Sequence, residues 1–264
     1  MTGQARNEAA IRAPSALLAL TELPRALAEF GALGLAAPIL ATAPRGDGHP
    51  VMVLPGFVTS DRSTTVLRRF LAGLGYDAHE WGLGRNLGPR AIGSEGEKLI
   101  DRLGQIHAAT RRKVSLVGWS LGGVMARQLS RRSPEAVRQV ITLGSPFTGT
   151  PRATNVWRAY EMLTGQKIDD PEVRDQLRES AVPPPVPSTA IYSREDGVVA
   201  WQNCVEPSGP ETDNIEVHGS HCGLGVNPSV LYAVADRLAQ GEGAWQPFER
   251  TGLKALVYPF AGHA

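Results

Sequence analysis

The chain has 264 residues, of which 42% are hydrophobic and 20% charged, and these ordinary globular values exclude a disordered or fibrous protein. Its 27 basic and 26 acidic residues leave a formal charge of +1, so no overall charge attracts nucleic acid or an anionic membrane. Two cysteines, Cys204 and Cys222, exclude a disulfide framework and a cysteine-rich zinc module, while a single bridge between them stays open.

Residues 15–40 are apolar enough to suggest a membrane helix, but they are interrupted by Glu22, Pro24, Arg25 and Glu29. A spanning helix needs about 20 nearly unbroken apolar residues. The pattern of a secretory signal, a charged segment followed by an apolar run, is not present in this stretch. We therefore expect residues 1–49 to form an N-terminal helical extension of a cytoplasmic protein without stable membrane insertion.

From about residue 50, short apolar runs alternate with longer helical patterns. Strands are predicted over 51–54, 76–81, 113–117, 137–143, 188–193 and 214–218. Helical spacing of apolar residues predicts helices over 63–74, 94–110, 121–132, 197–204 and 228–239. This alternation predicts an α/β fold with a mostly parallel, doubly wound sheet, in which the loops that follow the strands gather along one edge.

The alternation breaks between residues 147 and 187. Two modest helical patterns, over 154–164 and 171–180, precede the proline-rich run 183–187, and no convincing strand is present. We interpret this segment as an insertion between two strands of the sheet.

One loop carries a candidate nucleophile. The segment Gly118-Trp-Ser-Leu-Gly122 lies between the strand predicted over 113–117 and a helix that begins at residue 121. A tight strand-to-helix turn lifts a serine hydroxyl clear of the sheet, and the flanking glycines avoid collisions that a Cβ would make. This pattern arises readily by chance in a chain with 29 glycines, so its position between strand and helix carries the prediction. Ser120 is the candidate.

A nucleophilic serine needs a base, and the base needs an orienting acid. Asp196 follows the next-to-last predicted strand, and His221 follows the last one. Each member of the series Ser120, Asp196, His221 then lies at the carboxyl end of a different strand. Two neighbours compete for these roles, Glu195 for the acid and His218 for the base. We favour Asp196 for the Gly-Val-Val that follows it, and His221 because His218 is expected still within its strand.

The oxygen of a substrate under attack needs hydrogen-bond donors. The backbone N–H of Leu121, at the start of a helix, points to where negative charge would develop. Phe57, in the loop after the first strand, offers a second N–H, and Gly56 lets the backbone approach closely there.

The chain resembles an α/β-hydrolase of the bacterial serine esterase/lipase type over about residues 50–240. The segments that carry the resemblance are Val117-Gly-Trp-Ser-Leu-Gly-Gly123, Leu54-Pro-Gly-Phe57, Arg194-Glu-Asp-Gly-Val198 and Gly219-Ser-His-Cys222. It implies a catalytic triad of Ser120, Asp196 and His221, an oxyanion hole of Phe57 and Leu121, and a small helical cap over 147–187. The Leu-Pro-Gly-Phe loop replaces the His-Gly of many relatives, which argues against the hormone-sensitive-lipase-like branch.

Three aromatic residues are candidates for substrate binding. Trp119, beside the candidate nucleophile, either lines the acyl pocket or packs behind the turn. Trp157 and Tyr160 recur near helical spacing in the insertion, where such a stripe either faces the substrate or forms core. No metal site is expected, because helical metal-site spacing is absent from the remaining histidines, His49, His79, His107 and His263.

These observations predict a serine carboxylesterase acting on short to medium acyl chains, with no cofactor and with a small or lipid-like ester as its substrate. The same residues would also serve a lipase or an acyltransferase. A non-catalytic ligand-binding protein of the same fold is the alternative from another class. The sequence does not indicate the oligomeric state.

Overall fold

The computed structural model describes residues 11–252 and 254–259. Residues 1–10 of the expected N-terminal extension, and His263, lie outside these ranges.

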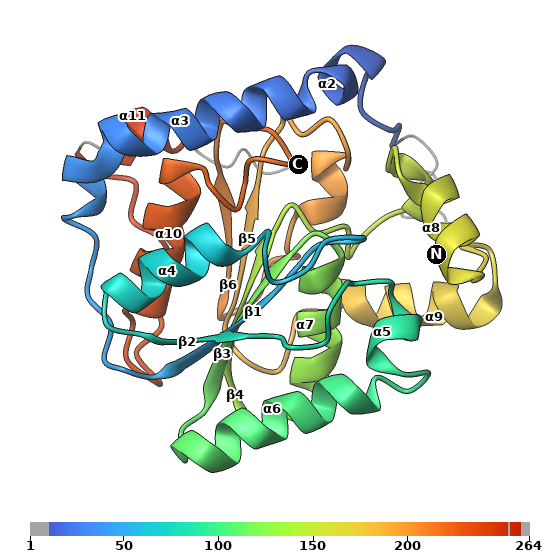
Figure 1. Ribbon diagram of the computed structural model, residues 1–264, viewed down its shortest axis with the longest axis horizontal. Helices are drawn as coiled ribbons and strands as arrows, with labels where there is room; N and C mark the ends of the chain where they lie inside the picture. Colours follow the sequence, from blue (N-terminus) through green and yellow to red (C-terminus); the bar gives the residue numbers. More distant parts are fainter. Residues whose placement is uncertain (1–10, 253, 260–264) are drawn as a thin grey trace.

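Six strands form one sheet in the order β2-β1-β3-β4-β5-β6, and every neighbouring pair is parallel (Figure 1). The strands are β1 (Pro50–Leu54), β2 (Asp77–Glu80), β3 (Val114–Trp119), β4 (Val137–Leu143), β5 (Ser188–Tyr192) and β6 (Thr212–Glu216). The chain runs from β1 outward to β2 and then returns to the other side of β1 as β3. This reversal opens a crevice between the carboxyl ends of β1 and β3, where ligands bind in open α/β sheets.

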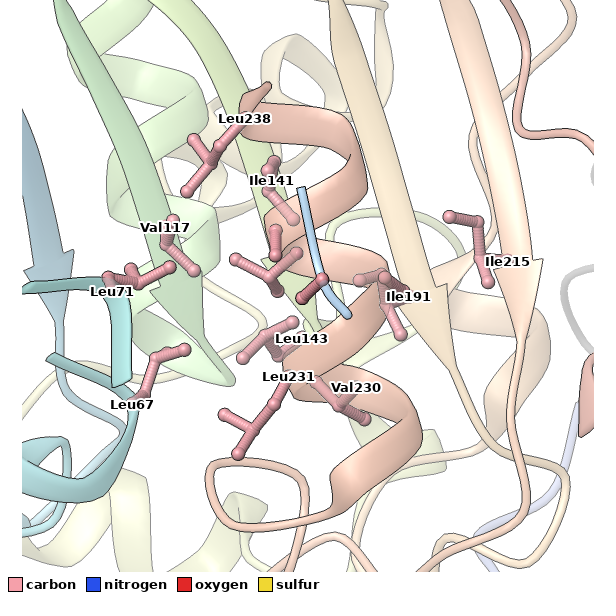
Figure 2. Close-up of a cluster of buried hydrophobic side chains, with 14 of the residues drawn as sticks. Leu67, Leu71, Val117, Ile141, Leu143, Ile191, Ile215, Val230, Leu231 and Leu238 are labelled. Carbon is pink, nitrogen blue, oxygen red and sulfur yellow. The ribbon is translucent and has the colours of Figure 1, made fainter. Parts of the chain in front are cut away.

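Helices cover both faces of the sheet, which is why the central strands β1 and β4 are buried along their whole length. One face is covered by α3 (Glu22–Leu40), α4 (Thr65–Gly73) and α10 (Pro228–Leu238). The other is covered by α5 (Pro89–Ile92), α6 (Glu97–Thr110) and α7 (Leu121–Arg132). Figure 2 shows the first of these two cores, in which Val230 and Leu231 of α10 lie among side chains from the strands.

The segment between β4 and β5 is helical, as expected for the insertion. It contains a 3₁₀ turn η1 (Pro151–Ala153), α8 (Trp157–Thr164) and α9 (Pro171–Ala181). The remaining short elements are α2 (Ala16–Leu20), a 3₁₀ turn η2 (Trp201–Cys204) and α11 (Lys254–Val257).

Most predicted elements are found within a few residues of their expected bounds, but the helix predicted over 197–204 is wrong. Only the 3₁₀ turn η2 forms there, because tertiary contacts use the backbone groups that would begin a helix. The Val198 oxygen accepts the Asn155 N–H, and the Ala200 N–H donates to the Ala153 oxygen, in the β-bridge that pairs Val199 with Thr154. The last strand ends at Glu216, so His218 lies beyond it rather than within it.

The N-terminal segment forms two consecutive helices, α2 and α3, along one side of the molecule (Figure 1). By length and composition alone α3 could cross a membrane, although one such helix near an N-terminus is weak evidence for a span. Its outer face is apolar and exposed, with Leu23, Leu27, Phe30, Leu35 and Ile39 facing solvent. Its inner face packs against α10.

Cys204 and Cys222 are both free thiols, so the bridge that the sequence left open is not formed. Cys204 is buried, and burial raises the pKa of its thiol well above the ordinary value.

Candidate active site

Ser120 lies on a sharp turn between β3 and α7, next to the crevice where the winding of the sheet reverses. Its φ of 52° and ψ of −121° are rare for a residue with a side chain, as expected of a strained nucleophile turn. The flanking glycines are required by space: a Cβ on Gly118 would lie 2.4 Å from the Gly122 oxygen, and one on Gly122 would lie 2.5 Å from the Leu54 oxygen. The structure therefore explains why this turn holds glycine on both sides of Ser120.

Asp196 and His221 form a buried pair. The Nδ1 atom of His221 lies 2.6 Å from Oδ2 of Asp196, and both side chains are almost completely buried. The other Asp196 oxygen accepts the N–H groups of Val198 and Val199, at 2.8 and 2.7 Å, which fixes the carboxylate. Since Nδ1 is occupied, Nε2 is the ring nitrogen left for a reacting group.

The surroundings of His221 raise its pKa. Burial by itself would lower the pKa of the imidazole, but the charge and hydrogen bond of Asp196, together with the charge of Glu22, outweigh it. The net direction favours the protonated ring, which is the form that a general base must reach during reaction.

The end of β4, at Leu143 and Gly144, lies between the Ser120 turn and the Asp196–His221 pair. The Ser120 N–H donates to the Leu143 oxygen at 2.8 Å. A Cβ on Gly144 would lie 3.1 Å from Oδ2 of Asp196 and 3.2 Å from Nδ1 of His221. Within the described part of the chain, Ser120 Oγ makes no hydrogen bond to the His221 ring, a contact that often tightens only when substrate binds.

The two competing residues pair with each other instead. Nδ1 of His218 lies 2.8 Å from Oε1 of Glu195, and both side chains are exposed. This surface pair lies on the same two loops as Asp196 and His221. The structure therefore brings together the residues that the sequence favoured and separates both rivals from them.

Phe57 and Leu121 lie together with Ser120 at the wall of one cavity. Their backbone N–H groups donate to no other group among the described residues, so both are available to a ligand. A Cβ on Gly56 would lie 3.4 Å from the Cβ of Ser120, which shows how closely this loop approaches the nucleophile turn.

Asn86 holds the Phe57 loop in place. Its completely buried side chain donates to the Pro55 oxygen at 2.8 Å and accepts the Gly88 N–H at 3.1 Å. Its backbone oxygen accepts the Val58 N–H at 2.8 Å. No sequence signal points to this supporting role of Asn86, because a lone asparagine in a glycine-rich loop carries no distinctive pattern.

The cavity has a volume of about 230 Å³ and mostly apolar walls. It extends from Ser120 along α7 and is covered by the helices of the insertion. Its apolar lining includes Val124, Met125, Leu129, Val173 and Leu177. Charged groups line it near the far end of α7, where Arg131 and Arg132 are found.

Of the three aromatic candidates, Trp157 and Tyr160 line the cavity and Trp119 does not. The Tyr160 ring packs at 5.4 Å from the Phe57 ring, which links the insertion to the candidate oxyanion loop. Trp119 instead donates from Nε1 to the His221 oxygen at 3.1 Å, and its ring packs against Gly225. Because the strand turns it away from the cavity, Trp119 supports the histidine loop rather than the substrate side.

A second Ser-His-Asp arrangement lies at the opposite edge of the sheet. Nε2 of His49 lies 2.8 Å from Ser115 Oγ, and Nδ1 of His49 lies 2.5 Å from Oδ1 of Asp47. Ser115 and His49 are completely buried, so no substrate reaches them. Burial lowers the pKa of His49, which keeps the ring neutral as a structural group. The two serines therefore differ in whether a substrate can reach them: Ser120 lines the cavity and Ser115 is buried.

In residues 11–252 and 254–259, no group of three or more His, Cys, Asp or Glu side chains is arranged to hold a metal ion.

Comparisons with known proteins agree with this architecture. The family model of the PGAP1-like alpha/beta domain matches residues 97–179, which include Ser120 and α7. No curated protein sequence matches the chain.

Many solved structures are similar to it, among them the following three. The monoacylglycerol lipase of Paleococcus ferrophilus has 14% identity and a TM-score of 0.53, with 73% of this chain and 96% of that chain covered. Lipase B of Aspergillus fumigatus has 19% identity and a TM-score of 0.56, with coverage of 78% and 56%, so the chain spans little more than half of that lipase. The Bacillus licheniformis lipase BlEst2 has 17% identity and a TM-score of 0.51, with coverage of 73% and 92%. The chain therefore has the α/β-hydrolase fold.

Proposed function

We propose that this protein is a serine carboxylesterase that hydrolyses esters of short to medium acyl chains through an acyl-enzyme on Ser120. The observation that supports it most is the buried Asp196–His221 pair beside a strained serine turn that opens into an apolar cavity. A cavity of about 230 Å³ lies below the roughly 300–1,000 Å³ of pockets that hold drug-sized ligands, which favours the shorter chains.

In the proposed first half-reaction, Ser120 Oγ attacks the ester carbonyl and transfers its proton to Nε2 of His221. The N–H groups of Phe57 and Leu121 donate to the carbonyl oxygen as it becomes an oxyanion. The bond to the alcohol oxygen then breaks, and the alcohol leaves with the proton from His221. Asp196 keeps the imidazole in the tautomer with Nε2 free and stabilises its cation.

In the second half-reaction, His221 takes a proton from water as the water oxygen attacks the acyl-serine. The tetrahedral species collapses, the bond to Ser120 Oγ breaks, and the proton returns to that oxygen. A carboxylic acid is released and the enzyme is regenerated.

The test is a set of initial rates on p-nitrophenyl esters from about two to sixteen acyl carbons, a span that brackets small and lipid-like ligands. Ser120→Ala is assayed in parallel, and intact-mass analysis follows reaction with a p-nitrophenyl phosphonate. We expect a maximum at short or medium chains, one phosphonate adduct on the wild type, none on the variant, and a loss in kcat of at least about 10⁴-fold. Activity in Ser120→Ala equal to wild type would refute the assignment.

The apolar cavity walls also favour a second candidate, acyl transfer to an alcohol, because an alcohol competes better with water in an apolar site. The ratio of new ester to free acid in water with added alcohol separates the two. A rate maximum at long chains would instead favour a lipase, as the three similar structures are named. Absence of both turnover and the phosphonate adduct would favour the ligand-binding alternative.

A further inference from the structure

Helix α3 carries its two carboxylates toward the protein and three of its five leucines toward solvent. Glu22, its first residue, is only 4% exposed, whereas Leu23 and Leu27 are 69% and 72% exposed. An ordinary surface helix has the opposite arrangement. The inward position of Glu22 therefore calls for a specific role in the interior.

Glu22 binds the loops of both His221 and Asp196. Its Oε1 atom accepts the N–H of Gly197 at 2.7 Å and that of His221 at 3.1 Å. Its Oε2 atom accepts the N–H of Cys222 at 2.7 Å. Gly197 directly follows Asp196, so one carboxylate joins the backbone of the candidate acid to that of the candidate base.

Glu29, two turns further along α3, makes a related contact to one loop only. Its Oε1 atom accepts the Ser220 N–H at 2.7 Å, and its Oε2 atom accepts from the Asn227 side chain at 3.1 Å. Glu29 thus offers an internal comparison: the same residue type on the same helix, bound to the histidine loop but not to the aspartate loop.

Glycines leave room for these helices against both loops. A Cβ on Gly197 would lie 2.4 Å from the Leu18 oxygen of α2, and one on Gly223 would lie 2.1 Å from Oε2 of Glu29. Real Cβ atoms do not approach backbone oxygen as closely as the first of these distances, so the Gly197 loop is shaped around α2, while Gly223 leaves room for the Glu29 carboxylate. Arg25 adds a contact to the same region by donating to the Glu195 oxygen at 2.8 Å.

We propose that Glu22 is a positioning residue, which fastens the Asp196 and His221 loops to each other and sets the environment of the His221 ring. This inference rests on the proposed function for its effect on rate, but its effect on the histidine does not depend on turnover.

The charged groups near His221 are few. Asp196 contacts the ring, and Glu22 contacts the backbone beneath it; both charges raise the pKa of His221. Arg25 donates to Glu22 at 2.9 Å. The neighbouring Cys222 thiol stays neutral through the pH range in which His221 titrates, because burial and the charge of Glu22 raise the pKa of the thiol to about 12. Loss of the Glu22 charge should therefore lower the pKa of His221.

The experiment compares wild type, Glu22→Gln and the matched control Glu29→Gln, with thermal unfolding to show that each is folded. The pKa of His221 is measured by NMR titration of the ¹⁵N-labelled ring, assigned by difference from His221→Gln. We expect Glu22→Gln to lower the pKa of His221, because the charge of Glu22 is one of those that raise it, and Glu29→Gln to leave it unchanged. An unchanged pKa in Glu22→Gln would overturn the electrostatic part, whatever the activity.

The positioning part is read from kcat and KM on a p-nitrophenyl ester. Because Gln cannot accept all three N–H groups, Glu22→Gln should lower kcat about ten-fold or more, with a smaller change in KM. Glu22→Asp keeps the charge but shortens the side chain, so it should leave the pKa of His221 unchanged and still lower kcat. This variant also tests positioning if Glu22→Gln does not fold. A wild-type kcat in Glu22→Asp would refute positioning. A wild type without esterase activity would refute the proposed function alone, since the NMR measurement would still decide the electrostatic part.

Discussion

Asn86 provides a direct test of how the candidate oxyanion hole is held. The change Asn86→Ala removes the bonds to the Pro55 oxygen and the Gly88 N–H, both inside the protein. An unsatisfied buried group costs about 1–3 kcal/mol, so the variant should lose roughly 2–5 kcal/mol of unfolding free energy. The backbone bonds of residue 86 to Val58 and Thr59 remain, so the loop should loosen rather than detach.

The loosened loop should also affect turnover. Complete loss of one oxyanion donor costs about 10²–10³ in kcat, and imprecise placement of the Phe57 N–H should cost about 10–100-fold. Stability is measured by urea denaturation, and kcat and KM are measured on p-nitrophenyl butyrate at a temperature where both proteins are folded. KM should change much less than kcat, because the donor binds the oxyanion more strongly than the ground-state carbonyl.

Asn214→Ala is the matched control. Asn214 also exchanges two hydrogen bonds with backbone, to the oxygen and N–H of Glu206 at 3.0 and 2.8 Å, but it lies on β6 outside the cavity lining. It should lose stability and keep its kcat. The reasoning would be refuted if Asn86→Ala kept a wild-type kcat, or if both variants lost kcat equally.

Two further predictions concern the proposed triad and the buried Ser115. The acid limb of kcat/KM should have its midpoint above pH 6.5, because the His221 ring must be neutral to act as a base and the charges of Asp196 and Glu22 outweigh burial in raising its pKa. Rates from about pH 5 to 9 at constant ionic strength measure this midpoint, and a value below 6.5 would contradict the site's electrostatics. Ser115→Ala removes the hydrogen bond to His49, so it should lose about 1 kcal/mol of stability and, in contrast to Ser120→Ala, keep full activity. A large loss of kcat in a folded Ser115→Ala would mean that the buried arrangement takes part in the reaction.

The strand and helix pattern was readable because it depends on local periodicity. Parallel strands covered on both faces are mainly apolar, and α4, α6, α7 and α10 show the apolar stripe of a helix that packs on a sheet. The prediction failed at 197–204, where residues 153–155 of the insertion bind the Val198 oxygen and the Ala200 N–H in a short β-bridge. Such long-range competition leaves no local trace in the sequence.

The apolar stretch 15–40 shows the same limit in another form. Glu22 and Glu29 stand out in it as interruptions, and their spacing of seven residues puts them on one face of a helix. That spacing was a usable signal for an inward polar face. What those carboxylates bind was not predictable, because their partners are backbone N–H groups about 170–200 residues away.

The sequence alone could predict the α/β class, the order of elements, and the position of Ser120, Asp196 and His221 after three different strands. It could do so because strand periodicity and turn chemistry are local properties, and parallel strands bring their carboxyl ends to one edge. The tertiary structure was needed to show that Asp196 pairs with His221 and Glu195 with His218. It also shows that Trp119 turns from the cavity to the histidine loop, and that Ser115 is buried while Ser120 is accessible. Those outcomes depend on where side chains from distant segments meet, which no local pattern encodes.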